Sequence, residues 1–386
     1  MDINRYEYKF IEKIVEDISN KTNRDFLHVA KHPVGLQSHI RQVKLLLDEG
    51  SKDEVHMVGL HGAGGMGKST LAKAIFNFIA DQFEGSCFLE DVKENSTLNN
   101  LKHLQEKILM KTVRSDDKLG GVSEGITKIK KMLCQKKILL ILDDVDKPEQ
   151  LEALAGGHDW FGGGSRVIIT TRDTQLLTYH GIERLHHVGE LYDEEAHELL
   201  RLMAFKNGEV PSTYGEIFSR ALTYVSGLPL AIVTIGSNLF GRSVEDWERI
   251  LDEYEKIPNK EIQRILKVSY DALEEKEKSV FLDIACCFKG CKWTKVKDIL
   301  HAHYGHCIKH HVEVLAEKSL INHRKNDSYM TLHDLIEDMG KEVVRQESPN
   351  NPGKRSRLWF HDDIVQVLKE NIVSKTNIYE HFVILT

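Results

Sequence analysis

The stretch "HGAGGMGKST" (residues 61–70) decides the fold of this 386-residue chain. It fits the phosphate-loop pattern G-x-x-x-x-G-K-[ST], follows the apolar run "EVHMVGL" (54–60) and opens a segment with helical periodicity. Glycines let successive backbone N–H groups curl around phosphate oxygens, and the helix N-terminus behind them adds positive potential. We expect Lys68 to bridge the outer phosphates of a nucleotide and Ser69 to hold Mg²⁺. The predicted nucleotide-binding residues of the loop are Gly62, Gly64, Gly65, Met66, Gly67, Lys68, Ser69 and Thr70.

Short apolar runs and helical patterns alternate around this loop. The apolar runs cover 54–60, 86–92, 137–145 and 165–172, and helical segments at 68–82, 101–112 and 122–135 lie between them. The runs are continuous, which is typical of parallel strands covered on both faces. The order predicts a parallel sheet wound by crossover helices. We expect this α/β domain, a P-loop NTPase, over residues 32–190, after a linker and helix at 1–31.

Charged residues follow two of the predicted strands. The run "KILLILDDV" (137–145) contains Asp143 and Asp144, as a Walker B strand does. We expect Asp143 to order Mg²⁺ through its water shell and Asp144 to orient an attacking water. Arg172 follows "SRVIITT" at the same edge, where open α/β sheets bind ligands, and could sense a γ-phosphate. With Lys68 these residues form the predicted catalytic set, although Arg172 could instead be a surface cation or part of a structural ion pair.

From about residue 190 the pattern becomes helical. Helix-period stretches predict a small all-α bundle over 191–258 and further helices over 259–386. Between two of these, "INHRKNDSYMTLH" (321–333) predicts a hairpin that turns at Asn326-Asp327. Helices capped by such a hairpin predict a winged-helix domain.

Composition excludes several classes of protein. The chain is 41% hydrophobic and 29% charged, and its net charge of −7 argues against a generally nucleic-acid-seeking surface. Six cysteines are too few and too unevenly placed for a secreted disulfide framework. No apolar run approaches the roughly 18 residues that span a bilayer. We expect a cytoplasmic or nuclear protein without a membrane partner.

Two clusters near the C-terminal half invite other interpretations. Cysteines and histidines over 286–311 suggest zinc, but they lack a clean C-x₂-C pair, and Cys286 and Cys287 fall in a predicted buried helix. Lysines over 289–297 keep an ATP-binding, winged-helix DNA-binding regulator as the alternative function. A solvated helix face is the preferred explanation of these lysines, because the negative net charge argues against DNA binding, and nucleic acid is not expected as a partner. A fast ATPase motor is a third possibility.

The ordered motifs resemble the NB-ARC module of plant intracellular immune receptors of the nucleotide-binding, leucine-rich-repeat class. The stretches similar to its phosphate loop, Walker B strand and arginine sensor strand are "GAGGMGKSTLA" (62–72), "ILLILDDVD" (138–146) and "GSRVIITTRD" (164–173). Its downstream signatures resemble "GLPLA" (227–231), "FLDIACCFKG" (281–290) and "LHDLIEDMG" (332–340). Within this class, the receptors that carry a TIR domain have motifs similar to three features of this sequence: Asp146 at the end of the Walker B motif, "FLEDVKEN" and "FLDIACCF".

The resemblance implies a STAND-class switch that holds ADP at rest, exchanges it for ATP, opens and self-oligomerises, with slow ATP hydrolysis. It implies three parts: the nucleotide-binding domain, a helical bundle (ARC1) and a winged helix (ARC2). TIR and leucine-rich-repeat domains would belong to the parent receptor, of which this chain is an excised central fragment or a truncated product. Any NAD hydrolase activity would belong to that TIR domain.

The resemblance also implies nucleotide contacts outside the phosphate loop. Val34, Gly35 and Pro229 would lie against the adenine, and His333 would reach the β-phosphate of ADP, with Asp334 steadying its loop. The residues alone leave structural alternatives open.

Helix capping explains both downstream stretches on its own. Gly227 can end one helix in a left-handed turn, and Pro229 can begin the next. Thr331 followed by Asp334 fits an N-terminal capping box, in which His333 would be an exposed residue of the first turn.

Overall fold

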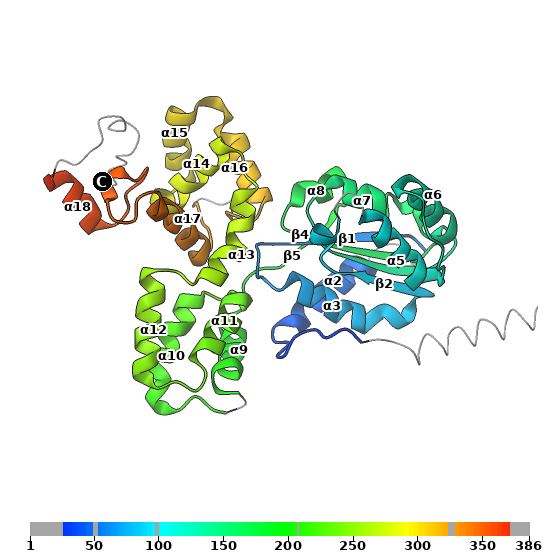
Figure 1. The fold of residues 1–386 in the computed structure, drawn as a ribbon, viewed down its shortest axis with the longest axis horizontal. Coiled ribbons are helices and arrows are strands. Elements are labelled where there is room, and N and C mark those ends of the chain that lie inside the picture. Colours follow the sequence, from blue (N-terminus) through cyan, green and yellow to red (C-terminus); the bar gives the residue numbers. More distant parts are fainter. Residues whose placement is uncertain (1–25, 49–52, 97–99, 207, 323–328, 371–386) are drawn as a thin grey trace, which may run out of the picture. The chain divides into compact units, whose positions relative to one another are not determined.

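The computed structural model describes residues 26–48, 53–96, 100–206, 208–322 and 329–370 (Figure 1). By their contacts the described residues form two units: those up to Gly62 together with Gly67–Val188, and Ala63–Met66 together with those from Gly189 onward. The helix predicted within 1–31 lies almost wholly outside the described residues. The predicted four-part division of the chain stays a prediction.

The first unit is built on a five-stranded parallel sheet with the strand order β2-β3-β4-β1-β5. The strands are β1 (His56–His61), β2 (Gly85–Leu89), β3 (Ile138–Val145), β4 (Arg166–Thr171) and β5 (Arg184–His187). The four apolar runs form β1 to β4, as predicted. The fifth strand was missed, because "RLHH" at the sheet edge lacks a continuous apolar run.

Helices cover both faces of the sheet (Figure 1). The helices of this unit are α2 (Leu36–Asp48), α3 (Lys68–Ile79), α4 (Val92–Asn95), α5 (Leu101–Val113), α6 (Val122–Leu133), α7 (Pro148–Ala155) and α8 (Thr174–Tyr179). Helices α2 and α3 lie on one face, against β1, β3 and β4. Leu140 and Val167 pack on the other face in a core shared with Ile108 of α5, Leu133 of α6 and Leu154 of α7. This two-sided burial is why the strands read as continuous apolar runs.

The second unit contains only helices and short bridges among its described residues. Its first four helices are α9 (Asp193–Phe205), α10 (Gly215–Val225), α11 (Pro229–Leu239) and α12 (Val244–Lys256). The rings of Phe205, Tyr214 and Trp247 pack on one another, and the Trp247 indole donates to Leu239 O at 2.8 Å. Helix α12 begins after Ser243, whose hydroxyl accepts the Asp246 N–H at 3.2 Å. The predicted bundle is therefore present.

Six further helices follow: α13 (Lys260–Asp271), α14 (Glu275–Asp283), α15 (Trp293–Tyr304), α16 (Ile308–Glu317), α17 (Asp334–Glu347) and α18 (His361–Glu370). Antiparallel bridges join Asn322 to Thr331 and Lys292 to Tyr329. The turn predicted at Asn326-Asp327 lies outside the described residues. Arg357 donates to Asp283 at 2.7 Å in a buried ion pair that ties the segment after α17 to α14.

The predicted buried helix around Cys286 is a π-helical turn, Ile284–Phe288, that continues α14. Burial raises the pKa of the Cys286 thiol, as expected of a cysteine that packs as a core residue. Within the described ranges no three His, Cys, Asp or Glu side chains lie close enough together to hold a metal ion. Among the same residues, no helix is both long and apolar enough to cross a membrane.

Candidate functional site

The phosphate loop connects the end of β1 to the start of α3, as its sequence requires. Gly62, Gly65 and Gly67 all have positive φ angles, of 153°, 82° and 89°. A Cβ at Gly62 would stand 2.3 Å from Val188 O, so the chain closes on this position. Gly67 is the N-cap of α3, so the first N–H groups of that helix lie in the loop. The backbone thus has the curvature and the donors of an anion cradle.

Lys68 is buried at the first position of α3, with 7% of its surface exposed. Its ammonium donates to Gly62 O at 2.9 Å, across the loop. Burial first, and then the nearby Arg172 cation, lower the pKa of Lys68 to about 7, against the attraction of Asp144 and Asp143. Phosphate oxygens would stabilise the charged form of this buried ammonium.

The two predicted magnesium ligands, Asp143 on β3 and Ser69 on α3, are hydrogen-bonded to each other. The buried Asp143 carboxylate accepts hydrogen bonds from the Ser69 hydroxyl and, at 2.6 Å, from the Thr170 hydroxyl. Burial raises its pKa, and these two hydrogen bonds oppose that rise. One hydroxyl and one carboxylate suit Mg²⁺, which keeps most of its water and takes few protein ligands. Ser69 and Asp143 therefore fit the ion.

Asp144 occupies a strained position at the end of the same strand. Its φ of 56° is left-handed, and the pairing of β3 with β4 shifts register between Leu142 and Val145. The Thr170 hydroxyl also accepts the Asp144 N–H, at 2.8 Å, so Thr170 positions both acids. Non-glycine residues in this conformation cost about 1 kcal/mol and concentrate at functional sites. Sequence reasoning missed Thr170.

Arg172 lies beyond β4, with its Nε 3.9 Å from Asp144 Oδ1. The structural ion pair that was the alternative for Arg172 is therefore present, in a loose form. Both side chains are about a quarter exposed, so the pair contributes little to stability. The Arg172 guanidinium therefore lies near Asp144 and contacts it only loosely.

Val34 and Gly35, the predicted adenine contacts of the first unit, lie directly before α2. The Val34 N–H donates to His32 O at 3.0 Å, and Gly35 has a φ of 76°. Gly35 has no side chain that would cover the backbone of this turn. Their contact with adenine stays a prediction.

The predicted helix junction at "GLPL" is confirmed. Helix α10 ends at Val225, Ser226 and Gly227 both have left-handed φ angles of 46° and 72°, and Pro229 begins α11. Within the second unit, the Leu230 N–H donates to Gly65 O at 3.2 Å. The N-terminal turn of α11 therefore lies against Gly65.

His333 corrects the capping-box interpretation. Helix α17 has His333, and not Thr331, as its N-cap: Nδ1 accepts the Leu335 N–H at 3.1 Å. His333 is 8% exposed, so the expectation of an exposed first-turn residue is wrong. Because Nδ1 is an acceptor, the ring proton is on Nε2, and this N–H donates to Ser226 O at 3.0 Å. Burial lowers the pKa of His333, which favours this neutral ring.

Asp334 binds the same serine. It accepts the Ser226 hydroxyl at 2.5 Å and forms an ion pair with Lys289, which also contacts Glu337 at 2.5 Å. Burial raises the Asp334 pKa, but the hydrogen bonds from Lys289 and Ser226 outweigh it, and the net shift is downward. We call Ser226, His333 and Asp334 the α10–α17 junction. Lys289, a candidate for DNA contact, is engaged here, whereas Lys292, Lys295 and Lys297 are exposed.

Comparison with known proteins agrees with this geometry. Residues 36–209 match the NB-ARC domain, and residues 274–348 match the winged-helix domain of Roq1-like disease resistance proteins. The chain is 37% identical to disease resistance protein RUN1 of Vitis rotundifolia over 94% of its own length and 27% of that protein. It is 38% identical to RPV1 of the same species, covering 94% of this chain and 26% of that protein. It is 36% identical to TMV resistance protein N of Nicotiana glutinosa, covering 94% of this chain and 31% of that protein.

The chain thus spans between a quarter and a third of the length of these relatives. It carries an NB-ARC domain followed by a Roq1-like winged-helix domain, and so belongs to the NB-ARC proteins.

Proposed function

We propose that this chain is the nucleotide-operated switch of a plant intracellular immune receptor, held at rest by ADP and activated by ATP, with slow ATP hydrolysis. The observation that carries the proposal is the buried ammonium of Lys68, which spans a glycine loop close to two acids and an arginine. The relatives support the biological setting, because their names describe disease resistance.

Phosphate and magnesium are held by the first turn of α3 and the end of β3. The N–H groups of the loop surround the phosphates, and Lys68 exchanges Gly62 O for phosphate oxygens. Ser69 would hold Mg²⁺ and Asp143 would order its water shell, and the ion would neutralise charge on the phosphates. Thr170 keeps the Asp143 carboxylate oriented toward Ser69.

Hydrolysis uses Asp144 and Arg172. A γ-phosphate competes with Asp144 for the Arg172 guanidinium, and the 3.9 Å separation makes that exchange easy. Asp144, once separated from Arg172, orients the attacking water. Turnover is slow because a switch must retain its nucleotide.

The resting state is recognised by His333. Its Nε2–H donates to Ser226 O. The β-phosphate of ADP accepts a hydrogen bond from the same N–H, either together with Ser226 O or in its place. Asp334 steadies the loop through Ser226 and Lys289. A contact made in only one conformation lets a nucleotide bias the two states. Val34, Gly35 and Pro229 hold the adenine through backbone and ring surfaces.

The remaining elements of the proposal concern the parent protein. The chain acts together with TIR and leucine-rich-repeat domains, self-oligomerises when ATP-bound, and works in the cytoplasm, the nucleus or both. NAD hydrolysis belongs to the TIR domain.

Bound nucleotide tests the proposal directly. The purified chain is denatured by heat, and the released nucleotide is identified by chromatography. We expect stoichiometric adenine nucleotide from the wild type and none from the Lys68→Ala variant. A chain that releases no adenine nucleotide, and takes up neither ADP nor ATP when these are added, rules the proposal out.

The resting-state contact needs its own measurement. Asp334→Val should accelerate dissociation of labelled ADP while leaving ATP dissociation nearly unchanged. Asp362→Val is the matched control, since Asp362 is an exposed acid in the first turn of another helix. Equal ADP dissociation rates in the wild type and Asp334→Val remove His333 and Asp334 from the mechanism without touching the phosphate loop.

A further inference from the structure

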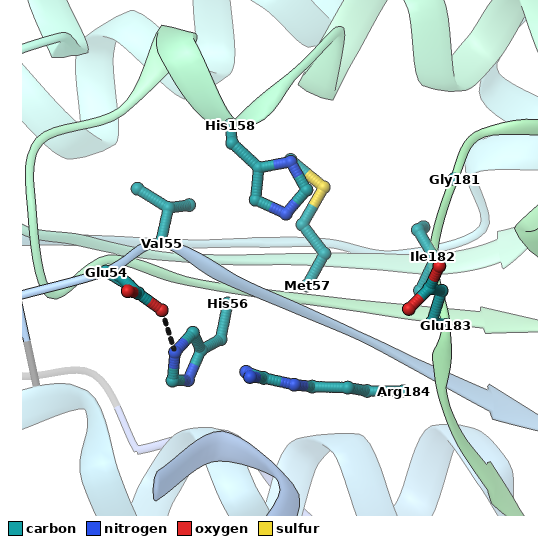
Figure 2. Close-up of a pocket in the computed structure, with 9 residues that line it drawn as sticks. All are labelled: Glu54, Val55, His56, Met57, His158, Gly181, Ile182, Glu183 and Arg184. Atoms are coloured by element: carbon teal, nitrogen blue, oxygen red, sulfur yellow. Dashed lines mark ion pairs between the residues drawn. The ribbon is translucent and has the colours of Figure 1, made fainter. Parts of the chain in front are cut away.

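A cavity of 420 Å³ lies at the edge of the sheet opposite the phosphate loop (Figure 2). Its walls are residues 54–57 at the start of β1, residues 181–184 at the start of β5, and His158. The phosphate loop follows the other end of β1, six residues away, or about 20 Å along a strand. The cavity is therefore separate from the nucleotide site and lies wholly within the first unit.

His56 contributes a buried polar atom without a partner. The side chain is 2% exposed, and its Nδ1 donates to Leu47 O at 2.6 Å. Since a carbonyl oxygen can only accept, Nδ1 carries the ring proton and Nε2 presents a lone pair. In the part of the chain that the structure describes, Nε2 has no hydrogen-bond partner. Such an atom costs free energy unless a donor reaches it.

Glu54 adds a second acceptor beside the first. Its Oε2 lies 3.8 Å from His56 Nε2, too far for a hydrogen bond between them. Burial lowers the pKa of His56, and the Arg166 and Arg184 cations add to this, so the ring stays neutral and Nε2 stays an acceptor. Two neighbouring acceptors with no donor between them leave room for one group that carries several N–H bonds.

Arg184 supplies the opposite charge. Its guanidinium extends toward the His56 ring in Figure 2, and it forms no hydrogen bond or ion pair with any residue in the described ranges. A half-buried guanidinium without a partner is suited to a planar carboxylate, which it binds through two parallel hydrogen bonds.

We propose that this cavity binds a free α-amino acid with an apolar side chain. The ammonium donates to His56 Nε2 and Glu54, the carboxylate pairs with Arg184, and the side chain contacts Met57 and Ile182. Glu54 and Glu183 give the lining one more negative than positive charge, which disfavours phosphates and nucleotides. These contacts need an ammonium and a carboxylate on the same carbon atom. Peptides and simple carboxylic acids lack that arrangement.

Isothermal titration of the full chain with L-leucine tests this proposal, with leucinamide and N-acetyl-leucine as probes that each lack one charge. We expect one saturable site for L-leucine and at least about tenfold weaker binding of either analogue, a loss of about 1.4 kcal/mol. Binding should be unaffected by inorganic phosphate. Equal binding of all three probes, displacement by phosphate, or no saturable binding at millimolar concentrations overturns the proposal.

Variants locate the site. Arg184→Gln should weaken L-leucine binding about tenfold, and Glu54→Gln, at the exposed rim, should weaken it less. Lys107→Gln, an exposed cation on α5 that packs beside β2, is the matched control and should bind as the wild type does. Undiminished ADP binding in each variant demonstrates folding. If Arg184→Gln binds L-leucine normally, or crystals grown with L-leucine hold only water between His56 and Glu54, the proposal is wrong.

Discussion

Ser226 binds His333 and Asp334 through two different atoms. Its carbonyl oxygen accepts the His333 Nε2–H at 3.0 Å, and its hydroxyl donates to the Asp334 carboxylate at 2.5 Å, across 108 residues of sequence. The two residues expected to recognise ADP are thus fixed to the left-handed end of α10, one residue before the "GLPL" turn. A substitution of His333 or Asp334 therefore removes a hydrogen bond to Ser226, the residue directly before that turn.

Two substitutions of Ser226 distinguish the contribution of its side-chain hydrogen bond to stability from the cost of its backbone strain. Ser226→Ala loses the bond to Asp334 and keeps a φ of 46°, so we expect a loss of about 1 kcal/mol, limited by the exposure of Asp334. Ser226→Gly also loses the bond but relieves a left-handed strain of about 1 kcal/mol, so its stability should lie near that of the wild type. Urea midpoints for the two variants give the comparison. Equal midpoints would show that strain at this position is negligible.

Lys68 should make the stability of the nucleotide-free chain depend on alkaline pH. Its folded pKa of about 7 lies below the ordinary lysine value of 10.5, so folding releases a proton between these values. The unliganded protein therefore gains stability as pH rises through that window. Lys68→Met, which has no ammonium to bury, should be more stable at pH 7 and lack this slope. Urea titrations at intervals from neutral to alkaline pH measure the difference; a parallel slope in both proteins contradicts it.

Nucleotide binding should reverse that proton release. Phosphates favour the charged form of Lys68, so binding ADP at a pH above 7 should take up a proton, with an uptake that declines as pH falls below 7. Titration calorimetry in buffers of different ionisation enthalpy counts the protons. A count that does not change with pH would place the ammonium away from the phosphates.

His333 should make the α10–α17 junction sensitive to acid. Protonation puts a hydrogen on Nδ1, which then cannot accept the Leu335 N–H. Because burial lowers the folded pKa of His333 below 6.5, its contribution to stability is complete above pH 6.5 and is lost as pH falls through the folded pKa. His333→Asn can cap the helix without titrating, so its ADP dissociation should lack this acid step. Stopped-flow release of a fluorescent ADP analogue from both proteins would reveal it.

The sequence predicted the features of the structure that depend on local patterns of residues. Continuous apolar runs gave β1 to β4, while β5 was hidden because three of its four residues are polar. Thr331 fits a capping box, yet its carbonyl accepts the Asn322 N–H at 2.7 Å, so its backbone is committed to a bridge and α17 starts three residues later. The contacts that Ser226 and Lys289 make with Asp334 span long sequence separations, which no periodicity signals.

Thr170 is the residue of the site that sequence reasoning passed over, and its removal should weaken magnesium-dependent chemistry. Thr170→Val preserves shape but deprives Asp143 of a donor and leaves the Asp144 N–H without its acceptor. The Asp143 pKa, already raised by burial, should rise further, so Mg²⁺ must displace a proton more often. We expect the Mg²⁺ concentration for half-maximal ATP binding to increase about tenfold, or about 1.4 kcal/mol. Thr178→Val, on an exposed turn of α8, is the control, and an unchanged Mg²⁺ requirement in Thr170→Val would mean that Ser69 alone orients the carboxylate.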